Sequence, residues 1–598
     1  MSITGSVFLA LVGMSEILLS IPVAWFFVRV ILQIKYFAGI NLMCIFIVCA
    51  IGADDIFVFM DAYVQSQYKG ANVVRDMETR FSWVYRKSGL AMAITSATTC
   101  AAFLTCFTTP LPDTQAFGVF AAVVIAADYI FVMTIFCTAV MVYHNRFEKP
   151  PACGFNVPTP FGSCFCGCCT ESCNCSLSDP SPTQKALTAS SNGRSEMESD
   201  KIELFFRTKF APMILNVKAR VVIAVVAIAW LIPAIVFVFK LTPTTKPEQF
   251  LNENHPFQKA INVLNNNFGA NSQDAGIDIF YVWGLQDVDR SGVNVLLNTS
   301  HLGKPVYDDK FKLSAACQDK IAQICDDFKT KNKTEEYLNM VQRNKEGQGS
   351  VKCFTYPLKE YQARNPGADR NAPKTWMTEF FKENVPEVDD EETSKIVPVS
   401  QRFNTAGGAR IGWDGTNLKF VGISIEAKAV TQWDRPPEDF MMKQYKMYDD
   451  LRANLDFIAA DACGSKVLMT DRFDGMADGG SKFVFMNNQR VYRTSAIRGA
   501  LIGVAIAFGV LLACTWSPVQ AVFATLSILC TMISVIGFTT MVGWDLGSIE
   551  AILISILAGF SVDYVVHLAH AFSHSYGTAH ERTVAAFSEM GSPVLSGM

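Results

Sequence analysis

The stretch GADDIFVFMD, residues 52–61, places three aspartates in a run of otherwise apolar residues. A helix that crosses a membrane needs about 20 mostly apolar residues, and residues 36–60 supply them. At about 100° per residue, Asp54, Asp61 and Gln65 fall on one stripe of this helix. Ionisable groups in the hydrocarbon layer cost roughly 2.5–3.5 kcal/mol each, so they indicate a transport pathway or a paired site.

A second run, GFSVDYVVHLAH at residues 559–570, is similar to the first. In each run a small residue lies four positions before an aspartate: Ala50 before Asp54, and Gly559 before Asp563. Internal repeats are typical of transporters, whose sites form where two repeated halves meet. The repeat predicts a helix bundle of two pseudo-repeated halves with the aspartates of both copies facing one another.

Three further ionisable residues lie within apolar runs. His567 is one turn from Asp563, where it either relays protons near neutral pH or is a plain polar residue that lines the site. Glu16 and Asp128 lie deep in two other runs, and helix packing or local hydrogen bonding explains them as well as transport does.

Eight segments qualify as membrane spans. Half of the residues are hydrophobic, 18% are charged and the mean hydropathy is +0.23, which is rare for a single soluble domain. The segments are residues 3–28, 36–60, 90–107, 115–143, 221–239, 496–514, 521–542 and 549–568. This pattern predicts a multi-pass protein of the plasma membrane or an endomembrane.

Basic residues predict the orientation. They gather in the loops at residues 75–87 and 146–220, which the positive-inside rule makes cytosolic. Residues 241–494 are then on the non-cytosolic face. Glycosylation acceptor sequences at Asn298 and Asn332 agree with that assignment, as does the even number of cysteines in this segment.

The external segment predicts an α+β domain. Helical spacing at residues 257–268, 311–328 and 437–455 alternates with strand-like runs at 277–283 and 418–425.

Its cysteines predict two disulfides. Cys317 and Cys325 are eight residues apart on one predicted helix, about 12 Å, which is too far for a bridge between them. Their partners should be Cys353 and Cys463, in an order that the sequence leaves open.

The loop between the fourth and fifth spans is rich in cysteine and then in Ser, Pro and Thr. Close to a membrane helix on the reducing side, cysteines favour palmitoylation, with an unmodified loop as the next reading. Their spacing lacks the two to four residues usual between zinc ligands, so we predict no metal there. Residues 201–218 mix aromatic and basic side chains as an interfacial helix does. The cysteines concerned are Cys164, Cys166, Cys168 and Cys169.

The predicted organisation has six parts. They are a first helix group of four spans (1–145), a cytosolic loop with an interfacial helix (146–219), one span (220–240), the external α+β domain (241–494), a second group of three spans (495–575) and a cytosolic amphipathic segment (576–598).

These features together resemble the resistance-nodulation-division superfamily. Within it the chain is similar to the Patched and Dispatched branch, which carries a sterol-sensing domain, and most similar to the Dispatched proteins. The likeness lies in GMSEI and SIP at residues 13–17 and 20–22, IGADDIFVFMDA at 51–62, FR at 206–207, YVWGL at 281–285 and GFSVDY at 559–564.

The resemblance implies a twelve-span bundle with a ferredoxin-like, porter-type external domain. The chain would begin at the third span and end before the eleventh, and residues 2–145 would be a sterol-sensing domain without its first helix. Gly52 and Gly559 match the family's aspartate motif, whereas Ala50 stands where that motif has its first glycine.

The resemblance also sharpens the predicted function. Asp54, Asp55 and Asp563 cannot all stay ionised in a poorly solvated core without a counter-cation, so a proton or a sodium ion should bind there. We expect no other cofactor. The predicted activity is cation-coupled movement or release of a sterol, a lipid or a lipid-modified protein.

Two other functions compete with transport. A sterol or lipid sensor that transports nothing would use the same helix group as a binding surface. An intramembrane metal hydrolase built on the aspartates and His567 is disfavoured, because the sequence has no H-E-x-x-H motif or nucleophile elbow. We therefore predict no enzymatic activity. Nucleic acid is also disfavoured as a partner, since no basic patch alternates with aromatic residues.

Overall fold

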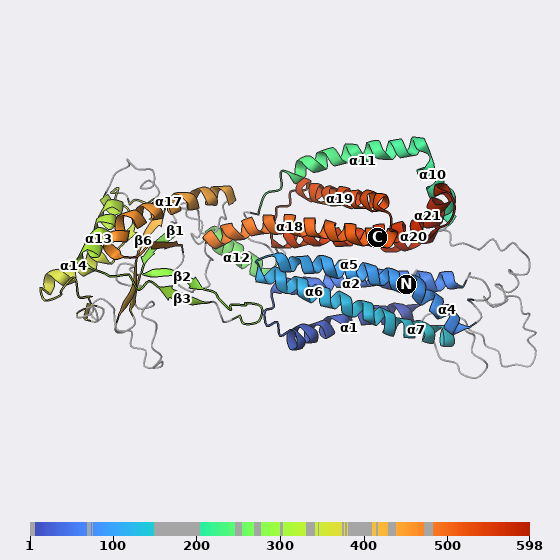
Figure 1. Cartoon of the computed structure of the whole chain (residues 1–598), viewed down its shortest axis with the longest axis horizontal. Helices are drawn as coiled ribbons and strands as arrows, with labels where there is room; N and C mark the ends of the chain where they lie inside the picture. The colour runs from blue at the N-terminus through green and yellow to red at the C-terminus, as the bar shows by residue number, and fades with distance from the viewer. Residues whose placement is uncertain are drawn as a thin grey trace, which may run out of the picture. The chain divides into compact units, whose positions relative to one another are not determined.

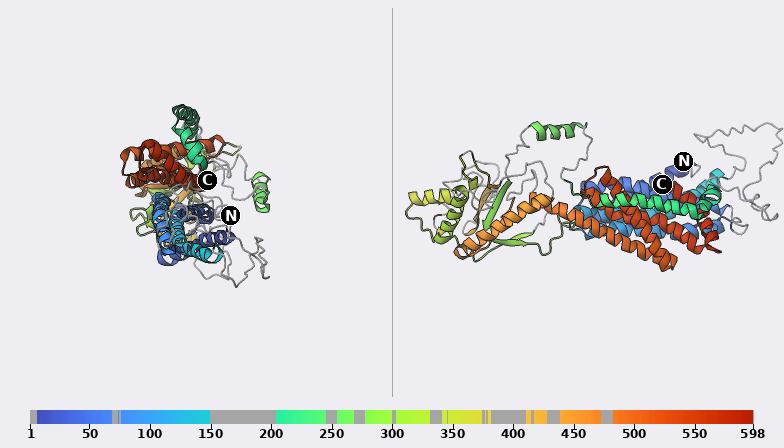
Figure 2. Two further views of the ribbon diagram at one scale, coloured as in Figure 1. Left: turned by 90° about the vertical axis from the view of Figure 1, so that its right-hand side faces the viewer. Right: turned by 90° about the horizontal axis from the view of Figure 1, so that it is seen from above.

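The structure is a computed structural model of the chain, shown in Figures 1 and 2. It divides into two compact units, one made of residues 1–241, 296–299 and 493–598 and the other of residues 242–295 and 300–492. The structure describes residues 6–67, 73, 76–148, 204–244, 254–267, 277–299, 303–330, 341–344, 346–373, 376, 379–380, 410–413, 417–427, 438–471 and 482–597.

Eight helices in the described part of the chain are long and apolar enough to cross a membrane, which confirms the predicted multi-pass architecture. In Figure 1 those of the first unit run side by side along one direction. The helices that form the spans are α1 (Val7–Phe26), α2 (Cys44–Ser66), α5 (Leu90–Thr105), α6 (Pro112–Phe131), α11 (Val217–Val238), α18 (Lys482–Thr515), α19 (Pro518–Met541) and α20 (Ser548–His574).

Several spans continue beyond the α-helix named above through a short π- or 3₁₀-helical turn, and α6 also continues through a second α-helix, α7. The extensions are η1 (Phe27–Ile31) after α1, η2 (Gly39–Met43) before α2, η3 (Tyr85–Gly89) before α5, η4 (Cys106–Thr108) after α5, and η5 (Val132–Phe136), α7 (Cys137–Tyr143) and η6 (His144–Glu148) after α6.

Small residues let the central helices approach closely. A Cβ atom added to Gly559 of α20 would lie 2.4 Å from the Cβ of Ala102 on α5. A Cβ at Gly503 of α18 would lie 2.8 Å from the Cβ of Ala558 on α20. Close backbone approach at small residues is the usual way in which membrane helices pack. It brings α5, α18 and α20 into one packed group.

Short helices lie at the predicted cytosolic ends of the bundle. Residues 204–215 of the predicted interfacial helix are helical, but the helix is interrupted at Asn216, whose side chain accepts a hydrogen bond from the Lys218 backbone N–H and caps α11. Phe210 and Phe587 pack with ring centroids 5.3 Å apart. The short helices are α4 (Met77–Val84), η7 (Phe206–Phe210), α10 (Ala211–Leu215) and α21 (Ala579–Gly597).

The second unit contains an antiparallel sheet with the order β4-β6-β1-β7, and β5 also pairs with β6. Ile279, Tyr281 and Trp283 alternate along β1 and pack in the same core as α13 and α17. Four strands of the main sheet and the two long helices follow the order β1-α13-β4-β6-α17-β7, which is the strand and helix order of a ferredoxin-like fold. This confirms the predicted α+β class. The elements are α12 (Pro256–Asn267), β1 (Ile277–Trp283), β2 (Leu285–Asp289), β3 (Lys304–Tyr307), α13 (Ala315–Thr330), β4 (Val351–Lys352), α14 (Thr355–Arg364), β5 (Arg410–Trp413), β6 (Leu418–Ala427), α17 (Glu438–Cys463) and β7 (Val467–Thr470).

Several helices differ from their predicted bounds; α17, for example, ends at Cys463 and not at residue 455. The helix predicted from residue 311 begins at Ala315, because Phe311 and Leu313 enter the core from an extended segment and Ser314 accepts a hydrogen bond from the Cys317 backbone N–H. The span predicted from residue 496 belongs to a longer helix that begins at Lys482. Neither start carries a strong breaker residue in the sequence.

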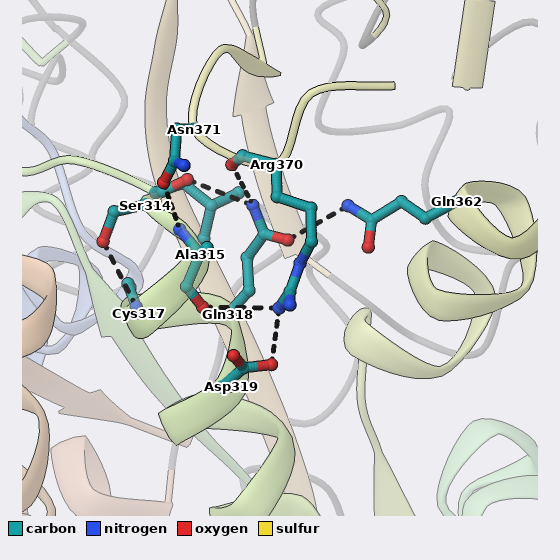
Figure 3. Close-up of polar contacts among 9 residues, drawn as sticks. Ser314, Ala315, Cys317, Gln318, Asp319, Gln362, Arg370 and Asn371 are labelled. Atoms are coloured by element: carbon teal, nitrogen blue, oxygen red, sulfur yellow. Dashed lines mark hydrogen bonds and ion pairs between the residues drawn. The ribbon is translucent and has the colours of Figure 1, made fainter. Parts of the chain in front are cut away.

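Side-chain amides and an arginine hold the loop at residues 365–372 against the start of α13 (Figure 3). Gln318 donates to the backbone oxygen of Arg370 at 2.9 Å, and Arg370 in turn pairs with Asp319 at 2.5 Å. Asn371 accepts a hydrogen bond from the Ala315 backbone N–H, and Gln362 donates to Gln318. These contacts fix the helix start next to a disulfide-bonded cysteine, Cys317.

Candidate functional site

Asp55 of α2 and Asp563 of α20 are both buried next to α5, with 8% and 9% of their surface exposed. The Ser96 hydroxyl donates to Asp55 at 3.0 Å. The Thr98 and Thr99 hydroxyls donate to the two oxygens of Asp563, at 3.1 and 3.0 Å. One polar stretch of α5 therefore holds a carboxyl from each half of the bundle.

The third predicted aspartate, Asp54, is half-buried on α2. It is close enough to Asp55 and to Asp563 for electrostatic interaction with both. The structure thus gathers all three predicted carboxyls in the bundle core. In the part of the chain that the structure describes, no ion pair with Lys or Arg involves any of them.

Glu16 of α1 and Asp128 of α6 extend the acidic cluster. Their exposed fractions are 1% and 3%, and Asp128 interacts electrostatically with both Glu16 and Asp55. Within the described part of the chain, both oxygens of Glu16 and one of Asp128 have no hydrogen-bond partner. The Phe136 backbone interacts with Glu16 without reaching hydrogen-bond geometry. Local hydrogen bonding among the described residues, one of the three explanations left open above, therefore does not account for these oxygens.

The motif's small residues have different surroundings. A Cβ at Gly52 would lie 2.7 Å from an oxygen of Asp128 and 2.9 Å from Ile17, so this glycine makes room for the carboxyl. Gly559 lies against α5, as described above. Ala50, which stands where the resemblance implies a glycine, is exposed.

His567 is buried one turn from Asp563 and interacts electrostatically with His570. Among the described residues no hydrogen bond joins His567 to Asp563, so its proton-relay role stays a prediction. No group of three or more His, Cys, Asp or Glu residues in the described ranges could hold a metal ion.

The remaining predicted sites lie away from the cluster. Cys317 bonds to Cys463 and Cys325 to Cys353, which settles the order that the sequence left open. Asn298 is exposed. Asn332 and the four candidate palmitoylation cysteines, Cys164, Cys166, Cys168 and Cys169, lie outside the described residues.

The hydroxyls of α5 were not among the predicted site residues. Ser96, Thr98 and Thr99 belong to the polar run TSATT at residues 95–99, which lies inside an apolar span. Such a run is a usable signal. A hydroxyl inside a span usually bonds to its own helix backbone, so the run alone does not point to the aspartates.

Comparison with known proteins shows which families the chain is similar to. The model of the sterol-sensing family, described as the sterol-sensing domain of SREBP cleavage-activation, matches residues 2–155. Protein dispatched homolog 1 of Mus musculus is 25% identical over 99% of the chain, and its Homo sapiens counterpart is 24% identical over 95%. The chain is thus similar to the Dispatched proteins over nearly its whole length.

The fold of the Dispatched-like chain also matches a solved structure. The hedgehog release protein Disp from the water bear Hypsibius dujardini aligns with a TM-score of 0.61 at 15% identity, over 99% of this chain and 64% of that one. The Dispatched-like chain covers 37% of the mouse relative's length and 35% of the human relative's. The helix bundle and the α+β domain of the chain therefore share the fold of that solved structure.

Proposed function

We propose that the Dispatched-like chain belongs to a cation-coupled secondary transporter that moves or releases a lipid, a sterol or a lipid-modified protein. The observation that carries this proposal is the pair Asp55 and Asp563, which come from opposite halves of the bundle and accept hydrogen bonds from hydroxyls of one helix, α5. The coupling cation is a proton or a sodium ion.

The energetics support a cation at this place. Several carboxyls in a low-dielectric core repel one another, and a bound cation removes that cost. Carboxyl and hydroxyl oxygens are hard ligands that suit both a proton and sodium. A cation that enters from one side and leaves to the other releases about 2.3 kcal/mol per charge for each 100 mV of membrane potential.

The hydroxyl contacts suggest how neutralisation of the aspartates could change the packing of the helices. When Asp563 is neutralised it no longer needs both the Thr98 and the Thr99 donor, and the contact between α20 and α5 weakens. Ser96 and Asp55 give α2 the same dependence on charge. Cation binding would thus change the packing of both repeated halves against one central helix.

The cargo is argued from the relatives. The water-bear structure is that of a hedgehog release protein, and the matched family is a sterol-sensing one. We infer that the cargo carries a sterol or an acyl chain, either as a free lipid or attached to a protein.

The test uses the full-length protein that contains this chain. Asp55→Asn with Asp563→Asn should abolish release of a lipid-modified cargo from cells. Asparagine keeps the shape of aspartate but carries no negative charge that a proton or a sodium ion could neutralise. Asp545→Asn, an exposed change outside the helices, is the matched control. Surface delivery is measured in parallel. Normal release by a correctly delivered double variant would refute cation coupling.

The sterol-sensing match at residues 2–155 also favours the second function, a sensor that transports nothing. The two functions predict different behaviour of one variant. A sensor with Asp55→Asn and Asp563→Asn keeps both sterol binding and its downstream response, whereas a transporter keeps binding and loses flux.

A further inference from the structure

A cavity of about 510 Å³ lies between α5, α18 and α20 in the first unit. Its size falls in the range of about 300–1,000 Å³ that is typical of small-molecule pockets. Leu90, Ile94 and Ala101 of α5 line one side, and Ile506 and Val510 of α18 line the other. The cavity therefore offers an apolar channel along two helices that cross the membrane.

The polar lining gathers at the predicted cytosolic end. There α18 ends at Thr515, α20 ends at His574, and α5 begins directly after a basic turn, η3. His570 and His574 line this end with their rings stacked at 4.1 Å between centroids. Trp516 lines it too and is 88% exposed, as expected for a tryptophan at the headgroup level of a bilayer.

The polar groups around this end can donate hydrogen bonds to an anionic headgroup. Of the described residues that line the cavity, none is acidic. Glu589 interacts electrostatically with His570, but it is paired with Lys87 at 2.5 Å. Arg86 is exposed one helical turn before Leu90. The polar groups near this end of the cavity thus include two imidazoles, one exposed guanidinium, and one carboxylate whose charge is balanced by a lysine.

We propose that this cavity binds one phospholipid of the cytosolic leaflet that has an anionic headgroup, such as phosphatidylserine. Its acyl chain lies between Ile94 and Val510, and its headgroup meets His570 and His574. The cytosolic leaflet is rich in anionic lipid, and basic groups near it are attracted to the surface. A purely apolar occupant would leave the two histidines without a role.

The cavity also contacts the cation site through one residue. Thr98 lines the cavity and donates to Asp563 at 3.1 Å, and the backbone oxygens of Ile94 and Thr95 are within reach of the same hydroxyl at 3.0 and 2.7 Å. A hydroxyl has one proton to donate. Which of these acceptors the Thr98 hydroxyl bonds to depends on the charge of Asp563. Because Thr98 also lines the cavity, a change in the charge of Asp563 should change the binding of lipid there. This coupling rests on the proposed function; the binding site itself does not.

The binding site is tested by photolabelling. The full-length protein is placed in phosphatidylcholine vesicles that contain a trace of a diazirine phosphatidylserine, a diazirine phosphatidylcholine or a diazirine sterol, and labelled peptides are located by mass spectrometry. Phosphatidylserine should label α5 and α18 most strongly. Ala101→Phe fills the cavity and should lower that label roughly tenfold or more, whereas Ala505→Phe, an exposed change on α18 outside the lining, should not.

A second variant protects the test against misfolding. His570→Gln with His574→Gln should abolish the preference for phosphatidylserine while the phosphatidylcholine label persists. Equal labelling by both phospholipids in the unmodified protein, stronger labelling by the sterol, or a label that Ala101→Phe leaves unchanged would each overturn the proposal.

The coupling has its own test. Asp563→Asn should change the phosphatidylserine label in the unmodified background and in Thr98→Ser, but not in Thr98→Val. An unchanged label in Asp563→Asn overturns the coupling. If aspartate variants keep normal release while the cavity label behaves as described, the proposed transport function fails and the lipid site stands.

Discussion

At the scale of single residues, the carboxyls are arranged by small and hydroxylated neighbours. Ser96, Thr98 and Thr99 supply donors that the apolar core otherwise lacks. Gly52 leaves the space that Asp128 occupies. The aspartates could be predicted from the sequence because a charged group in a membrane span has a high free energy. Their hydroxyl donors could not, because Ser and Thr are common in spans, where they usually bond to their own helix backbone.

Gly52→Ala tests the role of that space. The added methyl group would lie 2.7 Å from Asp128 and 2.9 Å from Ile17, so we expect a loss of about 1–3 kcal/mol in stability from overpacking. The measurement is thermal unfolding of the purified full-length protein. Gly509→Ala is the control, since no atom lies within 4 Å of its added Cβ. An equal response of the two variants would contradict the assignment.

At the scale of elements, α21 is held by contacts that its own amphipathic pattern does not specify. Lys87, just before α5, pairs with Glu589, and Phe210 packs on Phe587. Lys87 also donates to Gln65, which donates to Asp61 on α2. Asp61 and Gln65 share a stripe with Asp54, so this polar network continues the acidic face of α2 to the helix end.

Phe587→Ala should loosen α21. Loss of an aromatic pair costs about 0.5–1.5 kcal/mol beyond the buried area, and a partly detached helix is cut faster by protease. The measurement is limited proteolysis of the full-length protein in detergent, with cleavage sites mapped between residues 575 and 597. Tyr576→Ala removes a ring that is 97% exposed and should leave the rate unchanged. A similar rate in both variants would show that the ring pair does not hold the helix.

At the scale of the whole molecule, the two compact units differ in what their cores contain. The first buries charge among membrane-spanning helices, and the second buries a sheet under helices and is closed by two disulfides. Cys317–Cys463 spans 146 residues and Cys325–Cys353 spans 28. Bridges over such loops typically contribute about 3–5 kcal/mol, which matters to a domain of this size.

Cys317→Ser with Cys463→Ser should therefore destabilise the second unit selectively. We expect faster proteolysis within residues 242–492 and an unchanged pattern in the described helices of the first unit. The control is Cys530→Ser, a free cysteine of α19. Equal fragility of both units in the disulfide variant would contradict their independence.

The sequence by itself determined the eight spans, the α+β class of the external domain and the aspartates of the core. These follow from local rules: the length of apolar runs, the period of hydrophobic residues and the cost of charge in hydrocarbon. The orientation of the spans in the membrane stays a prediction.

The tertiary structure decided the rest. It joined Cys317 to Cys463, set Asp128 against Gly52, brought hydroxyls of α5 to both Asp55 and Asp563, and formed the cavity beside Thr98. Each of these facts joins residues from different helices or distant segments of the chain. Local patterns fix which face of a helix is polar or small, but the packing of several helices at once selects which partner that face meets.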